Sequence, residues 1–554
     1  MKTSSLRTKF FVLMMVGVLV VNVLLSAPQK AFTQTSKPNI VFVLVDDMDA
    51  DTINRDPEKY APHIKSLLID KGVTFPNFFV DVSLCCPSRS SILRGQYPHN
   101  TGVLNNKKPD GGFQKFYDKG NGPEKQTIAS LLKANDYRTA LIGKYLNGYP
   151  NTAPNDTYVP PGWTEWYSAM EKGEKNKQQG YGNPYTQYGY TLNQNGKLVK
   201  YGNNPEDYGT DVYTAFATDF IKRSARDNKP FFLYLAPYNI HSPYTPADRY
   251  KPLFQGVEAP TPPNFNETDG EGGFSTKPKF MQNQLKNRLD REQIECVNKS
   301  YRKRLRSLQS VDDTVNKLVD TLKASGQLDN TYIILTSDNG YKQGIHRVSL
   351  GKQSAYEEDI RLNLVVRGPG IPAGKKLQEI VGNIDFFPTF ADIAGVQPPR
   401  FVDGRSFLPL LKGTTPEPRK WRSAFLIEHT PDQKNPNVLE EEDLDDLDND
   451  LLQLAQEEQS QLADEDRSEC PDKLKKNKLY IPTYQAIRTR DYTYVEYETG
   501  AKELYDIKKD PYQLNNKAAT ADSALLQQLA NRLSKLRTCK AASCKAIEEE
   551  SFTP

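Results

Sequence analysis

Short continuous apolar runs alternate with longer amphipathic stretches along most of this 554-residue chain. Continuous apolar runs are typical of strands buried on both faces, as in a parallel sheet that helices cover. The stretch 300–323 has the period of a helix instead. The predicted strands are 39–45, 138–142, 231–236, 332–336 and 362–366. The pattern therefore predicts an α/β fold with a large, mostly parallel mixed sheet sandwiched by helices.

The character of the chain changes after about residue 418. An acidic, low-complexity insert occupies about 437–470. Two β-like segments and a helical segment follow it, at 484–489, 492–497 and 523–536. We therefore predict a main domain over 36–418 and a smaller C-terminal α+β subdomain over 419–554, which carries an antiparallel sheet.

The N-terminus has the layout of an export signal. Lys2, Arg7 and Lys9 precede an apolar run at 10–25, and small residues follow it. Sixteen residues are marginal for a bilayer span. We predict a signal peptide over 1–34 and an exported mature protein with no stable membrane association. An uncleaved signal anchor is the alternative.

The net charge of +3 argues against a general nucleic-acid binder, and six cysteines exclude a disulfide scaffold. That balance is uneven, because segment 440–469 holds 14 acidic residues against Arg467 alone. The rest of the chain is therefore cationic, which suits the attraction of anionic substrates. We expect the acidic insert to be a solvated face. The alternative is a lid that competes with an anionic substrate.

Polar side chains follow four of the predicted strands. They are Asp46 and Asp47, Lys144, His241, and Asp338 with Asn339. In an open α/β sheet, ligands bind outside the carboxyl ends of the strands, so these side chains can converge on one site. The Asp and Asn oxygens are hard ligands suited to Ca²⁺ or Mg²⁺. Each pair alone also fits a helix cap or a turn, but their joint position at strand ends favours a site.

The most specific motif is Cys85-Cys86-Pro87-Ser88-Arg89, with Gly95 after it. Two adjacent cysteines before proline also fit a buried pair or a vicinal disulfide. The core Cys-x-Pro-Ser-Arg, starting at Cys85, resembles the signature of the sulfatase family, within the alkaline-phosphatase-like superfamily. The resemblance covers nearly the whole mature chain, with further matching segments at 38–47, 336–340, 351–352, 367–370, 503–506 and 510–511. Segments 143–147 and 94–97 look most like N-acetylglucosamine-6-sulfatases and secreted arylsulfatases.

This resemblance implies that a maturation enzyme converts Cys85 to formylglycine, whose hydrated aldehyde is the nucleophile. Its second hydroxyl would let the sulfated intermediate collapse back to the aldehyde. The resemblance also implies a bound Ca²⁺, with Mg²⁺ less favoured. The implied metal-site residues are Asp46, Asp47, Cys85, Asp338 and Asn339.

The resemblance assigns further roles to basic and polar side chains. Arg89 would orient the formylglycine, and Lys144 and Lys352 would contact sulfate oxygens. His241 would protonate the leaving group. We also expect Asn147, together with Lys144, His241 and Lys352, to bind substrate.

One departure from the family pattern concerns the base. The histidine of the Lys-x-His segment found in many arylsulfatases is absent, because Tyr145-Leu146-Asn147 follows Lys144. We expect His346 to act as the base that regenerates the aldehyde. Four cysteines outside the motif allow three pairings, of which we favour Cys539–Cys544.

The leading hypothesis is a secreted sulfuric-ester hydrolase that acts on an aryl sulfate or a sulfated carbohydrate. The second is a phosphoric mono- or diester or phosphonate hydrolase of the same fold, because sulfate and phosphate esters have similar geometry. The third is a carbohydrate-binding or structural pseudoenzyme, which would keep Cys85 unmodified.

Overall fold

The computed structural model describes residues 37–171, 180–270, 272–414, 421–431, 470 and 478–551. The predicted signal peptide and all but the last residue of the acidic insert lie outside these ranges. The chain from Pro38 onward forms one compact unit. Within the described ranges, every helix is too short or too polar to cross a membrane.

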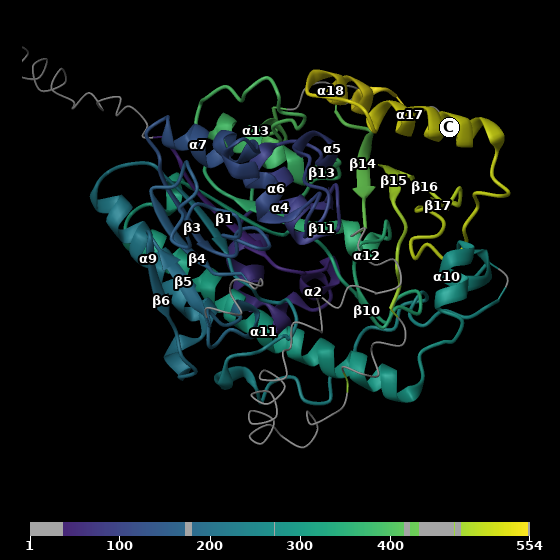
Figure 1. The fold of residues 1–554 in the computed structure, drawn as a ribbon, viewed down its shortest axis with the longest axis horizontal. Helices are drawn as coiled ribbons and strands as arrows, with labels where there is room; N and C mark the ends of the chain where they lie inside the picture. The colour runs from purple at the N-terminus through teal and green to yellow at the C-terminus, as the bar shows by residue number, and fades with distance from the viewer. Residues whose placement is uncertain are drawn as a thin grey trace, which may run out of the picture. The chain divides into compact units, whose positions relative to one another are not determined.

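The centre of the molecule is an 11-stranded mixed sheet (Figure 1). Its strands, in sheet order, are β12 (Lys375–Lys376), β2 (Val73–Phe79), β11 (Arg361–Arg367), β8 (Thr331–Ser337), β1 (Asn39–Val45), β7 (Phe231–Ala236), β3 (Arg138–Gly143), β4 (Glu165–Ala169), β5 (Thr191–Gln194) and β6 (Lys197–Lys200), and β13 (Val381–Gly382) also pairs with β2. The five strands from β8 to β4 are parallel to one another, whereas β11 and β5 are antiparallel to their neighbours. The predicted mostly parallel mixed sheet is confirmed.

Strand β1 shows why a continuous apolar run predicts a covered sheet. All seven of its residues are buried. Because successive side chains of a strand point to opposite faces, Ile40 and Phe42 enter one core and Val41 and Val43 enter the other. The strand therefore has no polar face to present to water.

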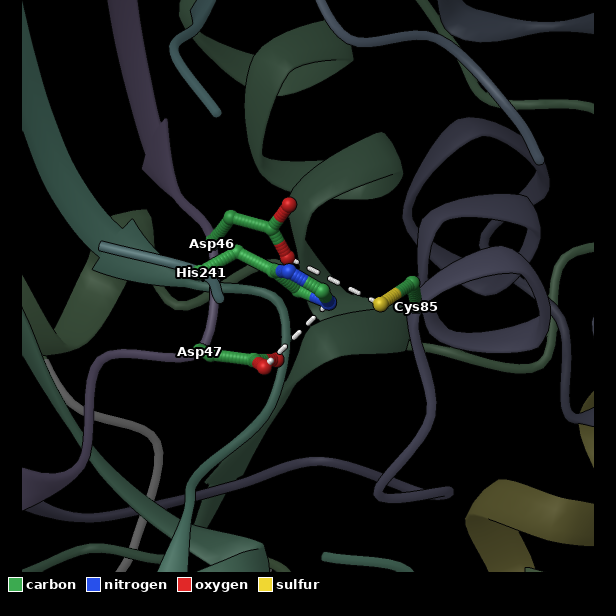
Figure 2. A group of neighbouring side chains, drawn as sticks. All are labelled: Asp46, Asp47, Cys85 and His241. Carbon is green, nitrogen blue, oxygen red and sulfur yellow. Dashed lines mark hydrogen bonds and ion pairs between the residues drawn. The ribbon is translucent and has the colours of Figure 1, made fainter. Parts of the chain in front are cut away.

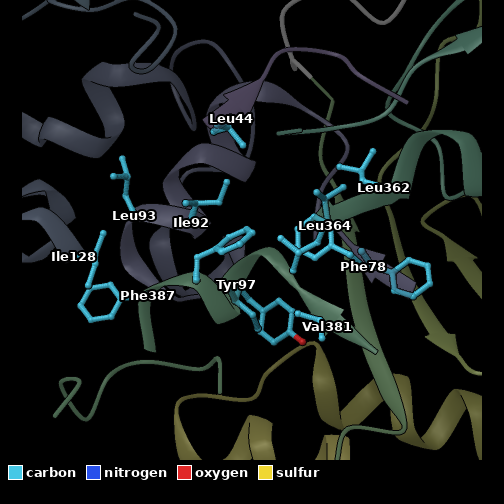
Figure 3. Close-up of a cluster of buried hydrophobic side chains, with 14 of the residues drawn as sticks. Leu44, Phe78, Ile92, Leu93, Tyr97, Ile128, Leu362, Leu364, Val381 and Phe387 are labelled. Atoms are coloured by element: carbon cyan, nitrogen blue, oxygen red, sulfur yellow. The ribbon is translucent and has the colours of Figure 1, made fainter. Parts of the chain in front are cut away.

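Helices cover both faces of the sheet. On one face, α9 (Gly209–Arg226) and α11 (Arg291–Ala324) pack over the Val41 core, together with the short π-helix at Ile64–Ile69. The opposite core, part of which Figure 3 shows, contains apolar residues of α4 (Cys85–Arg94), α7 (Ile128–Lys133) and α13 (Phe386–Ile393). The predicted helix 300–323 is the C-terminal two thirds of α11.

Short elements connect these layers. The helices are α2 (Ala50–Asn54), α3 (Pro57–Tyr60), α5 (Pro98–Thr101), α6 (Gly112–Tyr117), α10 (Lys279–Gln284), α12 (Glu357–Ile360) and α14 (Leu408–Leu411). A small hairpin of β9 (Lys342–Gln343) and β10 (Leu350–Gly351) lies between β8 and α12.

The C-terminal region forms the predicted antiparallel sheet. Its four strands are β14 (Ala424–His429), β15 (Tyr484–Thr489), β16 (Tyr492–Tyr497) and β17 (Lys502–Asp506), followed by α17 (Ser523–Leu536) and α18 (Ala542–Glu549). Its apolar side chains belong to the same core as Phe42 of β1. Arg422 also binds Asp385 of the main domain and Glu548 of α18, and all three side chains are fully buried. The predicted domain boundary at 418/419 lies outside the described residues.

Two disulfide bonds occur in the described part of the chain. Cys539 is joined to Cys544, and Cys296 of α11 is joined to Cys470, directly after the acidic run. Cys85 and Cys86 are free and buried, so the vicinal disulfide does not form.

Candidate active site

The parallel pairing of β1 with β8 brings together two carboxylates that are 292 positions apart in the chain. Val45 lies opposite Ser337, so Asp46 and Asp338 leave the sheet side by side. The backbone N–H of Asp47 donates to Asp338 Oδ1 at 3.2 Å. All three Asp side chains are buried. The expected convergence at the strand ends therefore occurs at the centre of the sheet.

Two neighbouring strands add cationic and imidazole groups to this cluster. Lys144 follows β3, and its Nζ lies 2.7 Å from Asp46 Oδ2. His241 follows β7, and its Nε2 lies 3.6 Å from Asp47 Oδ2, as Figure 2 shows. Both strands run parallel to β1, so their carboxyl ends reach the same edge.

Helix α4 supplies Cys85 as its first residue. Its Sγ lies 3.6 Å from Asp46 Oδ1 (Figure 2). Arg89 is four positions later and therefore on the same helix face, with its Nε 2.7 Å from Asp338 Oδ2. Cys86 points into the apolar core instead. The helix thus separates the two adjacent cysteines, one into the site and one into the core.

Asn339 and Lys352, which follow β8 in the chain, complete the cluster. Lys352 Nζ lies 2.7 Å from Asp47 Oδ1 and 3.1 Å from Cys85 Sγ. Asn339 Nδ2 donates to the same Asp47 oxygen at 2.5 Å. The nucleophile position is therefore flanked by an ammonium group and by carboxylates.

The residues fit a bound cation. Ligand atoms of Asp46, Asp47, Cys85 and His241 lie within 4.8 Å of one another. Asp47 Oδ2 and Asn339 Oδ1 are buried, and neither accepts a hydrogen bond from any described residue. Buried oxygens without donors cost free energy, and a hard cation satisfies them.

Burial and the charges of the site shift the pKa values of its carboxylates in different directions. Burial raises the pKa of Asp46, but Lys144, His241 and Arg89 outweigh it and bring the pKa below its ordinary value. Lys352 and His241 likewise lower the pKa of Asp47 against the effect of burial. Burial raises the pKa of Asp338, and Arg89 offsets only part of this. Burial also raises the pKa of the Cys85 thiol, despite the two lysines, so the thiol is neutral at pH 7.

The side-chain contacts of His346 are with residues outside the cluster. Its Nδ1 lies 3.1 Å from Glu267 Oε2, and its ring packs on Tyr356 with centroids 4.1 Å apart. Within the described ranges, no hydrogen bond or ion pair joins His346 to Cys85. The geometry therefore gives no support to the expectation that His346 regenerates the aldehyde.

Among the described residues, the side chain of Asn147 contacts Tyr185, a residue that the sequence did not single out. Asn147 Nδ2 donates to the Tyr185 hydroxyl at 3.2 Å. The Tyr185 ring lies 4.6 Å from the His241 ring and 4.9 Å from Lys144 Nζ. The only signal in the sequence was the polar stretch 171–207, which contains many tyrosines and carries no motif.

Comparison with known proteins agrees with this geometry. The profile of the family described as Sulfatase matches residues 38–396. The chain belongs to the sulfatase family. A second profile, described as the C-terminal region of N-sulphoglucosamine sulphohydrolase, matches residues 346–475. The chain is therefore a sulfuric-ester hydrolase by family.

Two named relatives illustrate the similarity. The N-acetylglucosamine-6-sulfatase of Homo sapiens is 35% identical over 515 residues, which cover 92% of this chain and 86% of that protein. The arylsulfatase of Chlamydomonas reinhardtii is 31% identical, with 92% of this chain and 76% of that protein covered. The family resemblance of the Cys85 motif is confirmed.

Solved structures share the fold. A protein in complex with its substrate D-glucosamine-2-N,6-O-disulfate superposes with a TM-score of 0.68 and 22% identity, covering 93% of this chain and 100% of that one. A phosphonate monoester hydrolase from Silicibacter pomeroyi superposes with a TM-score of 0.64 and 20% identity, covering 90% and 94%. At such identities the likeness concerns the fold alone.

Proposed function

We propose that this protein is an exported, calcium-containing sulfatase that removes the 6-sulfate from an N-acetylglucosamine-type sugar, using formylglycine made from Cys85. The observation that carries the proposal is the position of Cys85. Cys85 is the first residue of helix α4. Its side chain lies between the Asp46 carboxylate and the Lys352 ammonium group. A group attached there faces the cation-binding oxygens and two lysines at once.

The donor set supports both the metal and the modification. Asp46, Asp47, Asp338 and Asn339 would hold Ca²⁺, which supplies positive charge beside the nucleophile and the sulfate oxygens. The thiol sulfur of Cys85 is a soft ligand that suits neither Ca²⁺ nor Mg²⁺. The oxygen of a formylglycine hydrate is a hard ligand. Conversion of Cys85 by a maturation enzyme would therefore give a site in which every ligand to the cation is an oxygen.

The remaining side chains act on the substrate and on the nucleophile. Arg89 is fixed by Asp338 and holds the residue at position 85 in place through its charge. Lys144 and Lys352 bind sulfate oxygens and stabilise the negative charge that moves toward the leaving oxygen. His241 donates a proton to that oxygen, which a sugar alcohol needs far more than a nitrophenol does.

The substrate class and the location rest on other observations. Relatives named N-acetylglucosamine-6-sulfatase, 35% identical, support an amino-sugar 6-sulfate. Tyr185, beside His241 and bonded to Asn147, would contact the leaving sugar. Export is supported by the basic and apolar N-terminus and by relatives named extracellular sulfatases.

Turnover of matched esters tests the reaction. We expect hydrolysis of N-acetylglucosamine 6-sulfate and of 4-nitrophenyl sulfate, and much slower hydrolysis of 4-nitrophenyl phosphate and of a phenylphosphonate ester. A preference for either phosphorus ester would refute the proposal and favour the phosphoric-ester hypothesis.

Replacement of each adjacent cysteine tests the nucleophile. Cys85→Ala is expected to abolish turnover without unfolding the protein, whereas Cys86→Ala, whose side chain lies in the core, retains most activity. In the peptide that contains Cys85, mass spectrometry should find a loss of about 18 Da, the change from thiol to aldehyde. An unmodified thiol in active protein from the native host would contradict the modification.

A further inference from the structure

The segment that carries Lys352 has an unusual backbone. Gln353, the next residue, has a φ of 81°, in the left-handed region that non-glycine residues rarely adopt. Its peptide groups are held on both sides: its N–H donates to Ser83 Oγ at 3.3 Å, and its carbonyl accepts from the Tyr484 hydroxyl at 3.0 Å. Such a conformation persists only where the surroundings fix it.

The C-terminal sheet holds both segments that meet at the nucleophile. The backbone N–H of Glu428, in β14, donates to the carbonyl of Asp81 at 2.7 Å, four residues before Cys85. Tyr484, at the start of the neighbouring strand β15, holds Gln353. β14 and β15 are paired. Two adjacent strands therefore form hydrogen bonds with the segment just before Cys85 and with the segment just after Lys352.

Tyr484 is itself fixed in place. Its side chain is fully buried, its ring stacks on His429 with centroids 5.3 Å apart, and its edge meets Tyr497 at 5.5 Å. Its hydroxyl therefore has one direction, toward the Gln353 carbonyl. Through this hydrogen bond, the sheet fixes the position of the segment that contains Lys352.

We propose that Tyr484 is a positioning residue that sets Lys352 against the nucleophile, and that this is a function of the C-terminal sheet in catalysis. Tyr484 makes no contact with the reacting atoms in this scheme; it acts through Gln353 on Lys352. The inference rests on the proposed function, in which Lys352 binds the sulfate group.

Removal of one hydroxyl tests the role of Tyr484. Tyr484→Phe is expected to lower kcat/KM for 4-nitrophenyl sulfate about tenfold, the size expected for the loss of one buried hydrogen bond. The matched control is Tyr494→Phe, which removes another hydroxyl of the same sheet, bonded to Glu496 and Lys502. The control is expected to keep wild-type kcat/KM. Equal kcat/KM in the two variants would overturn the inference.

A double-mutant cycle separates positioning from general support of the fold. If Tyr484 acts through Lys352, Tyr484→Phe has no further effect on kcat/KM in a Lys352→Ala background. A loss of the same size in both backgrounds would overturn the inference. The same double-mutant cycle can be measured without turnover, from the Kd of inorganic sulfate determined by calorimetry. In the proposed function, Lys352 binds the sulfate group both in the ester and in the free ion.

The two proposals fail in different ways. A wild-type protein that hydrolyses no sulfate ester overturns the proposed function. A fully active Tyr484→Phe variant overturns only the role of the C-terminal sheet.

Discussion

Replacement of His99 by glutamine is expected to remove a stabilising contribution that depends on pH. His99 Nδ1 lies 2.8 Å from Glu428 Oε2, and Nε2 lies 2.9 Å from the carbonyl oxygen of Cys539. Both partners only accept hydrogen bonds, so both ring nitrogens must donate. Only the protonated imidazolium donates from both nitrogens.

The size of the contribution follows from the pKa. Burial lowers the pKa of His99, but the hydrogen bond and the charge of Glu428 outweigh it and raise the pKa from 6.5 to about 9. A folded pKa raised above the unfolded one gives stability that is complete below about 6.5 and disappears as the pH rises through about 9. The shift corresponds to about 3 kcal/mol of unfolding free energy.

Urea unfolding, followed by tryptophan fluorescence at pH 6 and at pH 10, measures this contribution. Wild type is expected to exceed His99→Gln by about 3 kcal/mol at pH 6 and by little at pH 10. Glu428→Gln should remove most of the same pH dependence, because it replaces the charged carboxylate that raises the pKa of His99 with a neutral amide. A wild-type advantage of equal size at both pH values would refute the reasoning.

Three further outcomes are expected. EGTA should abolish sulfate-ester turnover and added Ca²⁺ should restore it; full activity after chelation would contradict the metal assignment. Arg422→Ala leaves buried Asp385 without its guanidinium partner and takes one of two from buried Glu548, which keeps Arg405, and should cost about 3–5 kcal/mol of unfolding free energy. Lys535→Ala, in an exposed pair, should change the urea midpoint little, and equal midpoint shifts would contradict this. Under oxidising conditions, Cys470→Ser opens a disulfide loop with a sequence separation of 174, and Cys544→Ser opens one with a separation of 5. The expected costs are about 5 and about 2 kcal/mol, so the reverse order in the unfolding midpoints would contradict the chain-entropy argument.

Local patterns in the sequence predicted five of the eleven strands of the main sheet. The predicted strands 39–45 and 231–236 coincide with β1 and β7, and the other three predicted strands of the main sheet agree within one residue at each end. These strands are buried on both faces, so their apolar runs are continuous and end where the sheet ends. The polar residues after them could therefore be recognised as candidates for a site.

Local sequence patterns do not show which distant segments of the chain contact one another. The sequence left three disulfide pairings open, and only the fold joins Cys296 to Cys470. For Tyr185 it offered only the polar stretch 171–207, because a tyrosine in an irregular loop follows no periodic pattern that would place it beside His241. The family resemblance suggested His346 as the base beside the nucleophile, whereas in the structure its Nδ1 lies 3.1 Å from Glu267 Oε2.

The sequence by itself determined which residue types stand at the strand ends and that Cys85 begins the sulfatase motif. The tertiary structure decided which of those residues meet. Asp46 contacts Lys144 because β3, β7 and β1 are neighbouring parallel strands, and Lys352 reaches Cys85 because two strands of the C-terminal sheet hold both segments. Side-chain chemistry is a property of each residue, whereas distances between residues hundreds of positions apart depend on the register and packing of the whole sheet.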